Sequence, residues 1–382
     1  MDDILILGSG LAGYTLAREI RAIDTEIPLH LITADAGDFY AKPMLSNGLQ
    51  KGKDAEGLIN ATAAQMAEQY GLTIDTGRRV TGINDAQQQV MTETGDQRYA
   101  SLVLALGAHP IIPVMGGDAA DQRLTINSLH DYARFRQRLP APPAHIAIIG
   151  PGLIGCEFAN DLLIAGYRVT LIGPDPHPIS TLLPEITAQA LQHAMQQAGA
   201  EWRLLQTAAL MEKREQGYHL TLTDASTLSC DLVLSAVGLR PETDLAAAVG
   251  LKVARGVVTD RFLKSSHEAI YALGDCAEVA GLNLPYVMPI MHAARALAKT
   301  LTGQPTEVTY PAMPVVIKTP LHPIAVAPPT PGVAGDWRIE RQDAGTRCLF
   351  HAPDGKLQGF VISGCFIEEK QALTRRLPPL LA

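Results

Sequence analysis

The chain has 382 residues, of which 47% are hydrophobic and 18% are charged, and its formal net charge is -8. This composition is typical of a folded protein of two or three domains. The negative charge argues against nucleic acid as the main partner, because binding to phosphates needs a basic surface. No apolar run reaches the roughly 18 residues of a membrane-spanning helix, so the sequence predicts no membrane span.

The start of the chain and its cysteines bear on where the protein works. Residues 4–7 already form a strand-like apolar run with no basic segment before it, so we expect no secretory signal. The five cysteines are widely spaced without a C-x-x-C pair, and no histidine cluster has metal-ligand spacing. The sequence therefore predicts reduced thiols, a cytoplasmic location and no metal site.

The first predicted unit is a strand, a glycine motif, a helix and a second strand. Residues 2–8 are strand-like and run into Gly8-Ser9-Gly10-Leu11-Ala12-Gly13, a helical pattern follows, and a strand is expected at 28–33. In such a βαβ unit the first glycine permits a tight turn and the second lets the backbone approach a pyrophosphate. The third lets the helix pack on the strand, with the phosphates at the helix N-terminus.

The same plan recurs about 140 residues later. An apolar strand at 146–149 leads into Gly150-Pro151-Gly152-Leu153-Ile154-Gly155, then a helix and a strand at 167–172. One glycine motif is weak evidence, because glycines are common in turns. Two copies in the same context predict two dinucleotide sites.

The residues after each second strand distinguish the two nucleotides. Asp35 follows the first and is placed for a ribose hydroxyl, although it could be a plain surface aspartate. After the second, Gly173 stands where an acidic residue is usual, and no arginine follows to bind a 2′-phosphate. Arg168 lies inside the strand. This pattern favours NADH over NADPH.

A hydride donor needs an acceptor, and flavin is the natural one because it takes a hydride and releases electrons singly. A disulfide reductase would need paired cysteines beside the flavin, but residues 40–46 read Tyr-Ala-Lys-Pro-Met-Leu-Ser. We therefore expect electrons to pass directly to an outside acceptor. Cys156, at the start of the second motif's helix, is expected to be a packing residue.

The predicted fold class is α/β, with two Rossmann-like dinucleotide-binding domains, for FAD and NAD, and a small α+β C-terminal domain. Apolar strands at 102–106 and 232–237 each end in glycine and are expected to close the two sheets. We place the FAD domain at 1–108 and 242–312, the NAD domain at 109–241, and a C-terminal interface domain at 313–382.

Four segments, residues 8–13, 40–46, 150–157 and 271–278, carry a family resemblance. Together they resemble the FAD-dependent pyridine nucleotide-disulfide oxidoreductases of the electron-transfer branch, and within it the rubredoxin reductases, over essentially the whole chain. The resemblance implies FAD as cofactor, NADH as donor, and rubredoxin or a related small iron carrier as acceptor. Flavorubredoxin and ferredoxin stay open, although Asn47 stands where many ferredoxin-linked relatives have lysine and Lys42 where they have arginine.

The resemblance also implies site residues. Glu157 would lie near the nicotinamide, and Lys42 and Lys318 would lie along the flavin, where a cation stabilises the charge of the reduced ring. The alternatives are an acidic residue favouring the helix dipole and two ordinary solvated lysines. The predicted FAD ligands are Gly8, Gly10, Ala12, Gly13, Ala34, Asp35, Lys42, Val80, Gly107, Asp275, Val287 and Lys318, and those for NADH are Gly150, Gly152, Gly155 and Glu157.

Two other kinds of flavoprotein are alternatives. A nucleotide-sensing protein of the apoptosis-inducing-factor type would turn over slowly, whereas an NADH oxidase usually needs an active-site cysteine, and none is visible beside the flavin motif. Because rubredoxins and this chain are both acidic, overall charge attraction does not drive their encounter. We expect a small, transient and partly apolar interface with local lysines or arginines.

Overall fold

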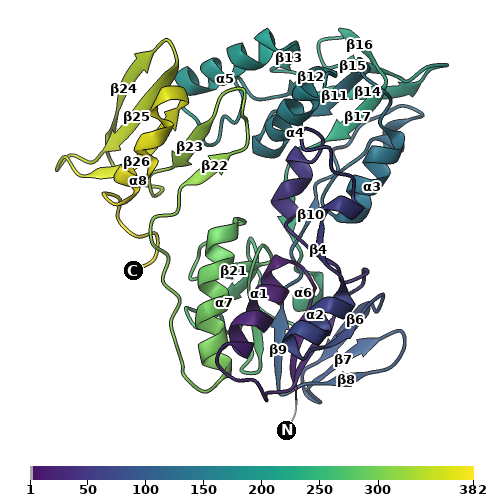
Figure 1. Cartoon of the computed structure of the whole chain (residues 1–382), viewed down its shortest axis with the longest axis vertical. Helices are drawn as coiled ribbons and strands as arrows, with labels where there is room; N and C mark the ends of the chain where they lie inside the picture. The colour runs from purple at the N-terminus through teal and green to yellow at the C-terminus, as the bar shows by residue number, and fades with distance from the viewer. Residues whose placement is uncertain (1–2) are drawn as a thin grey trace.

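The computed structural model describes residues 3–382. Figure 1 shows two regions built of sheet and helices, one at the bottom and one at the top right, and an antiparallel sheet at the top left formed by the end of the chain. The main sheet of each of the first two regions is parallel. The predicted fold class is thereby confirmed.

The first region holds a five-stranded parallel sheet in the order β20-β9-β1-β2-β5. Its strand β20 comes from beyond the second region, so two separate segments build this sheet. Helices α1 and α7 lie side by side (Figure 1) and share one apolar core with the strands. The bounds are β1 Ile4–Leu7, α1 Leu11–Arg21, β2 Leu29–Ile32, β5 Thr73–Asp75, β9 Ser101–Leu104, β20 Ile270–Ala272 and α7 Val287–Leu301.

Smaller elements complete this region. The antiparallel strands β6, β7 and β8 form a meander, β3 pairs with β4, and β19 pairs with β21. The bounds are β3 Phe39–Tyr40, η1 Lys42–Asn47, η2 Glu56–Leu58, β4 Ile59–Ala61, α2 Ala63–Tyr70, β6 Val80–Asn84, β7 Gln89–Thr92, β8 Gln97–Arg98, α6 Asp244–Ala248, β19 Val257–Thr259 and β21 Ala277–Val279.

The second region repeats the plan with the order β13-β12-β11-β17, all parallel, and a separate meander of β14, β15 and β16. The chain enters and leaves it through β10 and β18, which pair antiparallel. The bounds are β10 Ala108–Pro110, η3 Ala120–Gln122, α3 Leu129–Arg138, β11 His145–Ile149, α4 Leu153–Ile164, β12 Arg168–Gly173, α5 Glu185–Gln197, β13 Ala200–Leu204, β14 Ala208–Lys213, β15 Tyr218–Leu222, β16 Thr227–Cys230, β17 Leu232–Ser235 and β18 Leu239–Pro241.

The C-terminal region is an antiparallel sheet in the order β22-β23-β26-β25-β24, followed by two short helices. Its end returns to the linker, because Leu381 pairs with Tyr310. The bounds are β22 Val315–Ile317, β23 Ile324–Ala327, β24 Asp336–Gln342, β25 Gly345–His351, β26 Leu357–Ser363, η4 Gly364–Glu369 and α8 Lys370–Thr374.

One apolar core joins all three regions. It contains Leu45 from the first region, Phe135 and Phe158 from the second, and Ile324 and Val361 from the third, all buried. In Figure 1 the C-terminal sheet accordingly lies beside α5 and the second region rather than beside α1 and α7. The predicted boundaries at 108, 241 and 312 stay predictions. Within residues 3–382, every helix is too short or too polar to cross a membrane.

Candidate active site

The first glycine motif forms a phosphate cradle at the N-terminus of α1. Gly8 has a φ of +113°, and a Cβ there would lie 2.4 Å from the Ala105 carbonyl oxygen, so only glycine fits. A Cβ on Gly13 would lie 2.0 Å from the carbonyl oxygen of Gly8. Gly10 caps the helix without a side chain, and a Cβ there would meet none of the described atoms within 4 Å. The space beside Gly10, at the end of α1 where the first N–H groups have no partner within the helix, is therefore open.

The second motif repeats this geometry at the N-terminus of α4. Gly150 has a φ of +110°, and its Cβ would lie 2.4 Å from the Ala236 carbonyl oxygen, while that of Gly155 would lie 1.9 Å from the Gly150 carbonyl oxygen. Gly152 caps α4 with φ −74° and ψ −174°, against −68° and −177° for Gly10. Each cradle fits one pyrophosphate, and two such sites fit FAD and NAD(H).

Asp35 is held in place at the end of β2. Its Oδ1 accepts hydrogen bonds from Thr33 Oγ1 (2.7 Å), the Gly37 N–H (2.9 Å) and Ser9 Oγ (3.0 Å). The side chain is exposed, and its Oδ2 receives no hydrogen bond from residues 3–382. A fixed carboxylate with one open oxygen beside the phosphate cradle suits a ribose hydroxyl, and exposed Ala34 leaves room for it.

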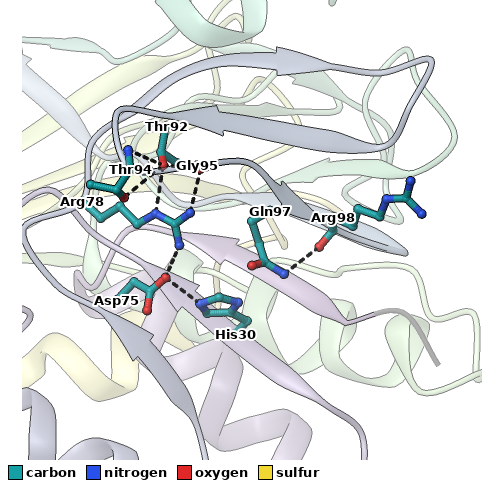
Figure 2. A network of polar contacts seen from close by, with 8 residues as sticks. All are labelled: His30, Asp75, Arg78, Thr92, Thr94, Gly95, Gln97 and Arg98. Atoms are coloured by element: carbon teal, nitrogen blue, oxygen red, sulfur yellow. Dashed lines mark hydrogen bonds and ion pairs between the residues drawn. The ribbon is translucent and has the colours of Figure 1, made fainter.

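A polar network around Arg78 fixes the turn between β5 and β6 (Figure 2). Arg78 contacts the Asp75 carboxylate, donates to Thr92 Oγ1 (2.9 Å) and donates to the Gly95 carbonyl (2.7 Å). Buried His30 approaches the same carboxylate at 3.1 Å. The network joins the edge strand β5 to the β6–β8 meander, and so positions Val80, the first residue of β6, for the predicted adenine contact.

Lys42 begins η1 beside a group of carboxylates. Its Nζ donates to Asn127 Oδ1 (3.1 Å), and Asn127 in turn donates to the Ala108 carbonyl (2.7 Å). Burial lowers the pKa of Lys42, and the carboxylate of Asp275 offsets part of this effect. Burial raises the pKa of Asp275, against the opposite effect of the Lys42 charge. The charges of Lys42 and Asp275 therefore stabilise each other electrostatically.

Glu157 on α4 joins three parts of the chain. The side chain is 1% exposed. Its carboxylate accepts from Ser46 Oγ of η1 (2.7 Å), accepts from the Lys318 backbone N–H (3.0 Å), and forms an ion pair with the Lys318 ammonium. Lys318 Nζ also donates to Ser46 Oγ (3.0 Å). A buried carboxylate needs such partners, because an unpaired one would be strongly destabilising.

Further polar residues of α4 fasten the same junction. Asp161 lies one helical turn beyond Glu157 and accepts from the backbone N–H groups of Leu49 and Gln50 (both 2.9 Å). Burial raises the pKa of Asp161, and these two N–H groups oppose that shift. Asn160 Oδ1 accepts from the Leu321 N–H (3.1 Å). Helix α4 thus binds η1 on one side and the C-terminal region on the other.

The remaining predicted ligands lie in three separate parts of the first region. Gly107 has a φ of +73° just after β9, and its carbonyl accepts from the Glu242 N–H (3.0 Å). Val287 is the first residue of α7, is 39% exposed, and follows Tyr286, which caps the helix without a side-chain hydrogen bond. Ala12 is buried in α1. Their contacts with a flavin stay predictions.

The cysteines nearest the two nucleotide motifs are buried, free thiols. Cys156 is buried, and burial raises the pKa of its thiol. Cys276 is also buried, and burial raises the pKa of its thiol to about 11. Both favour the protonated packing role over a reactive thiolate. In the described part of the chain, no three histidine, cysteine or carboxylate side chains gather closely enough to hold a metal ion.

Two family models match the chain. Residues 2–299 match the model of pyridine nucleotide-disulphide oxidoreductases, which spans well over half of the chain and both glycine cradles. The chain belongs to this family. Residues 307–377 match the rubredoxin binding C-terminal domain.

Full-length relatives agree with the family. The rubredoxin-NAD(+) reductase of Alcanivorax borkumensis is 43% identical over 382 residues, covering 100% of both chains. The nitric oxide reductase FlRd-NAD(+) reductase of Aeromonas salmonicida is 39% identical, covering 98% of this chain and 96% of the relative. Among solved structures, the covalent putidaredoxin reductase–putidaredoxin complex matches with a TM-score of 0.88 and 25% identity, over 99% of this chain and 94% of that one.

The sequence did not assign Ser46, Asn127 or Asp161 to the site. Ser46 stands in a family motif, but nothing local shows that its hydroxyl bridges Glu157 and Lys318. Asp161 follows Glu157 at helical spacing. Two acidic residues on one face of an otherwise apolar helix could have indicated that both make polar contacts inside the protein. Asn127 gave no signal, because its contact with Lys42 joins residues far apart in the sequence.

Replacing Arg78 with alanine is expected to weaken FAD retention by about tenfold and to lower the melting temperature, because it leaves Asp75 and the meander unconnected. Flavin fluorescence released on dialysis measures the retention. Arg98→Ala is the matched control, since in Figure 2 Arg98 contributes only its backbone carbonyl. Equal FAD loss in both variants would contradict the assigned role.

A double-mutant cycle tests the Glu157–Lys318 pair. Glu157→Gln and Lys318→Met should each destabilise the protein to urea, because the first removes the counter-charge of half-buried Lys318 and the second removes that of buried Glu157. The double variant should lose less than the sum of the two, by about 2 kcal/mol. Strictly additive losses would show that the pair contributes no coupling.

Proposed function

We propose that this chain is a flavoprotein reductase that moves electrons from NADH through FAD to rubredoxin. The observation that carries the proposal is a pair of phosphate cradles with the same geometry in one chain whose C-terminal part, residues 307–377, matches a rubredoxin-binding domain. The family implies FAD and NAD(H) together. The full-length identity of 43% to a rubredoxin-NAD(+) reductase supports this acceptor.

Different residues of the chain bind the two nucleotides. The cradle at Gly8 to Gly13 and the Asp35 carboxylate hold FAD, and the cradle at Gly150 to Gly155 holds NADH. When bound, the flavin supplies hydride acceptance and single-electron release. Hydride transfer needs close alignment, which the nicotinamide-side Glu157 supports, and needs no acid–base triad.

Lys42 and Lys318 supply positive charge near the junction. Lys42 is half-buried, and this burial lowers its pKa, so water screens its charge less and the charge stabilises nearby negative charge more strongly than that of a solvated lysine. Lys318 is fixed by Glu157 and Ser46, which removes its rotational freedom. Cys156 and Cys276 are buried packing residues, so electrons leave the flavin without forming or breaking a disulfide.

A groove in the C-terminal region is the proposed contact for the carrier. It is a cavity of about 570 Å³ lined by residues that include Pro311, Pro314, Lys370, Thr374 and Arg375. Its mixture of proline and positive charge fits a small, partly apolar interface with an acidic protein. Pro314, which lines the groove, is followed by β22 and then by Lys318. The groove is therefore joined through one strand to the place where Lys318 contacts Glu157.

Flavorubredoxin is the second candidate acceptor, because a FlRd-NAD(+) reductase is 39% identical over nearly the full length. A ferredoxin has weaker support, since Asn47 and Lys42 depart from the ferredoxin-linked pattern. A nucleotide-sensing role would require slow turnover. The cytoplasmic location, the strictness for NADH and the domain boundaries stay predictions.

The test is spectroscopic. The purified protein should be yellow, its flavin absorbance should bleach within seconds of anaerobic NADH addition, and NADH-driven cytochrome c reduction should rise when rubredoxin is added. Purified flavorubredoxin and ferredoxin serve as alternative carriers. A protein that stays colourless after reconstitution contradicts the flavoprotein assignment, and a yellow protein unaffected by rubredoxin contradicts only the acceptor.

Reversing the charges of the groove with Lys370→Glu and Arg375→Glu should raise the KM for rubredoxin about tenfold at low salt. Added salt should reduce the difference from the unmodified protein, because it screens exposed charges. NADH–ferricyanide activity should not change. Lys356→Glu, on the β25–β26 turn, is the matched control, and an equal effect of this variant would place the carrier elsewhere.

A further inference from the structure

Asn127 joins Lys42 to the segment where the chain leaves the first region. Its Oδ1 accepts from the Lys42 ammonium (3.1 Å), and its Nδ2 donates to the Ala108 carbonyl (2.7 Å). A carbonyl only accepts hydrogen bonds, so the contact with Ala108 fixes the amide with its oxygen toward Lys42. The Asn127 backbone is fixed as well, because its N–H donates to Asp131 Oδ2 (3.1 Å), within the capping box of α3.

The start of α3 is anchored on the segment that carries Lys42. The Leu129 N–H donates to Tyr40 Oη (3.2 Å), and Tyr40 stands two residues before Lys42. Three residues further along α3, Tyr132 Oη donates to the Lys53 carbonyl (3.0 Å). The amide oxygen just before α3 is therefore a preformed acceptor at a fixed place beside η1.

The carboxylates around Lys42 differ in how fully they are engaged. Those that act on its charge are, in order of strength, Asp275, Asp131 and Asp35. Asp131 and Asp35 already accept hydrogen bonds from backbone N–H groups. Burial raises the pKa of Asp275, and within residues 3–382 its carboxylate receives no hydrogen bond and forms no direct ion pair with Lys42. Asp275 is therefore the carboxylate toward which a Lys42 ammonium without its amide partner would move.

We propose that Asn127 is a positioning residue that holds the Lys42 ammonium beside the flavin and away from the Asp275 carboxylate. The inference rests on the proposed function, in which Lys42 lies along the FAD. A neutral amide takes one of the three ammonium donors and leaves the positive charge in place, whereas a carboxylate would cancel much of it. The remaining charge stabilises the negative charge of the reduced flavin. Asn127 thereby raises the midpoint potential of the flavin.

Equilibrium reduction of the FAD-loaded protein, followed against redox dyes, tests this role without NADH or rubredoxin. Asn127→Asp keeps the shape of the side chain and adds a counter-charge beside Lys42. Asn127→Leu removes the acceptor and frees Lys42 to approach Asp275. Each variant should lower the equilibrium constant for flavin reduction about tenfold, which corresponds to roughly 30 mV for a two-electron couple.

A double-variant comparison shows whether the effect passes through the lysine. Lys42→Met should itself lower the potential, and Asn127→Leu added to it should cause no further shift. A purely structural Asn127 would lower the melting temperature of the variants and leave the potential unchanged. Asn60→Leu, which replaces an exposed amide on β4, is the matched control and should keep the potential of the unmodified protein.

Two results overturn the proposal. One is an unchanged potential in both Asn127 variants, and the other is an equal shift from Asn127→Leu with and without Lys42. In either case the protein is still a yellow reductase, so the proposed function stands. A chain that takes up no FAD contradicts the proposed function itself, and the role of Asn127 with it.

Discussion

The Glu157 carboxylate is the constraint on which the arrangement of the three regions depends. It is buried, and its partners come from η1 and from the start of the C-terminal sheet. Removing the Lys318 ammonium would leave the buried Glu157 carboxylate without its counter-charge, at a cost of several kcal/mol. Asp161 and Asn160 on the same helix add backbone contacts on both sides. Helix α4, which caps the second cradle, is therefore the structural link between nucleotide binding and the C-terminal region.

The two cradles reach one geometry through different side chains. Both use a left-handed first glycine and a third glycine packed on a carbonyl oxygen. Around the second strand, however, the first unit uses the Ser9–Thr33 hydroxyl pair, and the second uses the Pro151–Gly173 contact. The backbone register is common because phosphate binding depends on N–H groups and the helix N-terminus. The side chains beyond it were free to differ.

The sequence predicted the fold class, both glycine motifs and the strands flanking them, because these depend on local periodicity and on glycine spacing. It predicted Glu157 and Lys318 separately, but their ion pair joins residues from two regions and has no local signature. The sequence showed Gly173 where an acidic residue is usual, but it could not show the reason, because the contact that excludes a side chain at 173 is made by Pro151, in a different turn. Contacts across the junction are fixed by tertiary packing, which periodicity does not report.

The origin of the cation beside Glu157 has a consequence for electron delivery. This cation comes from Lys318, within the part that matches a rubredoxin-binding domain. Moving that region would break the ion pair and expose the shared core around Phe158 and Val361. The cost of such motion favours a carrier that docks on a preformed surface and departs without rearranging it.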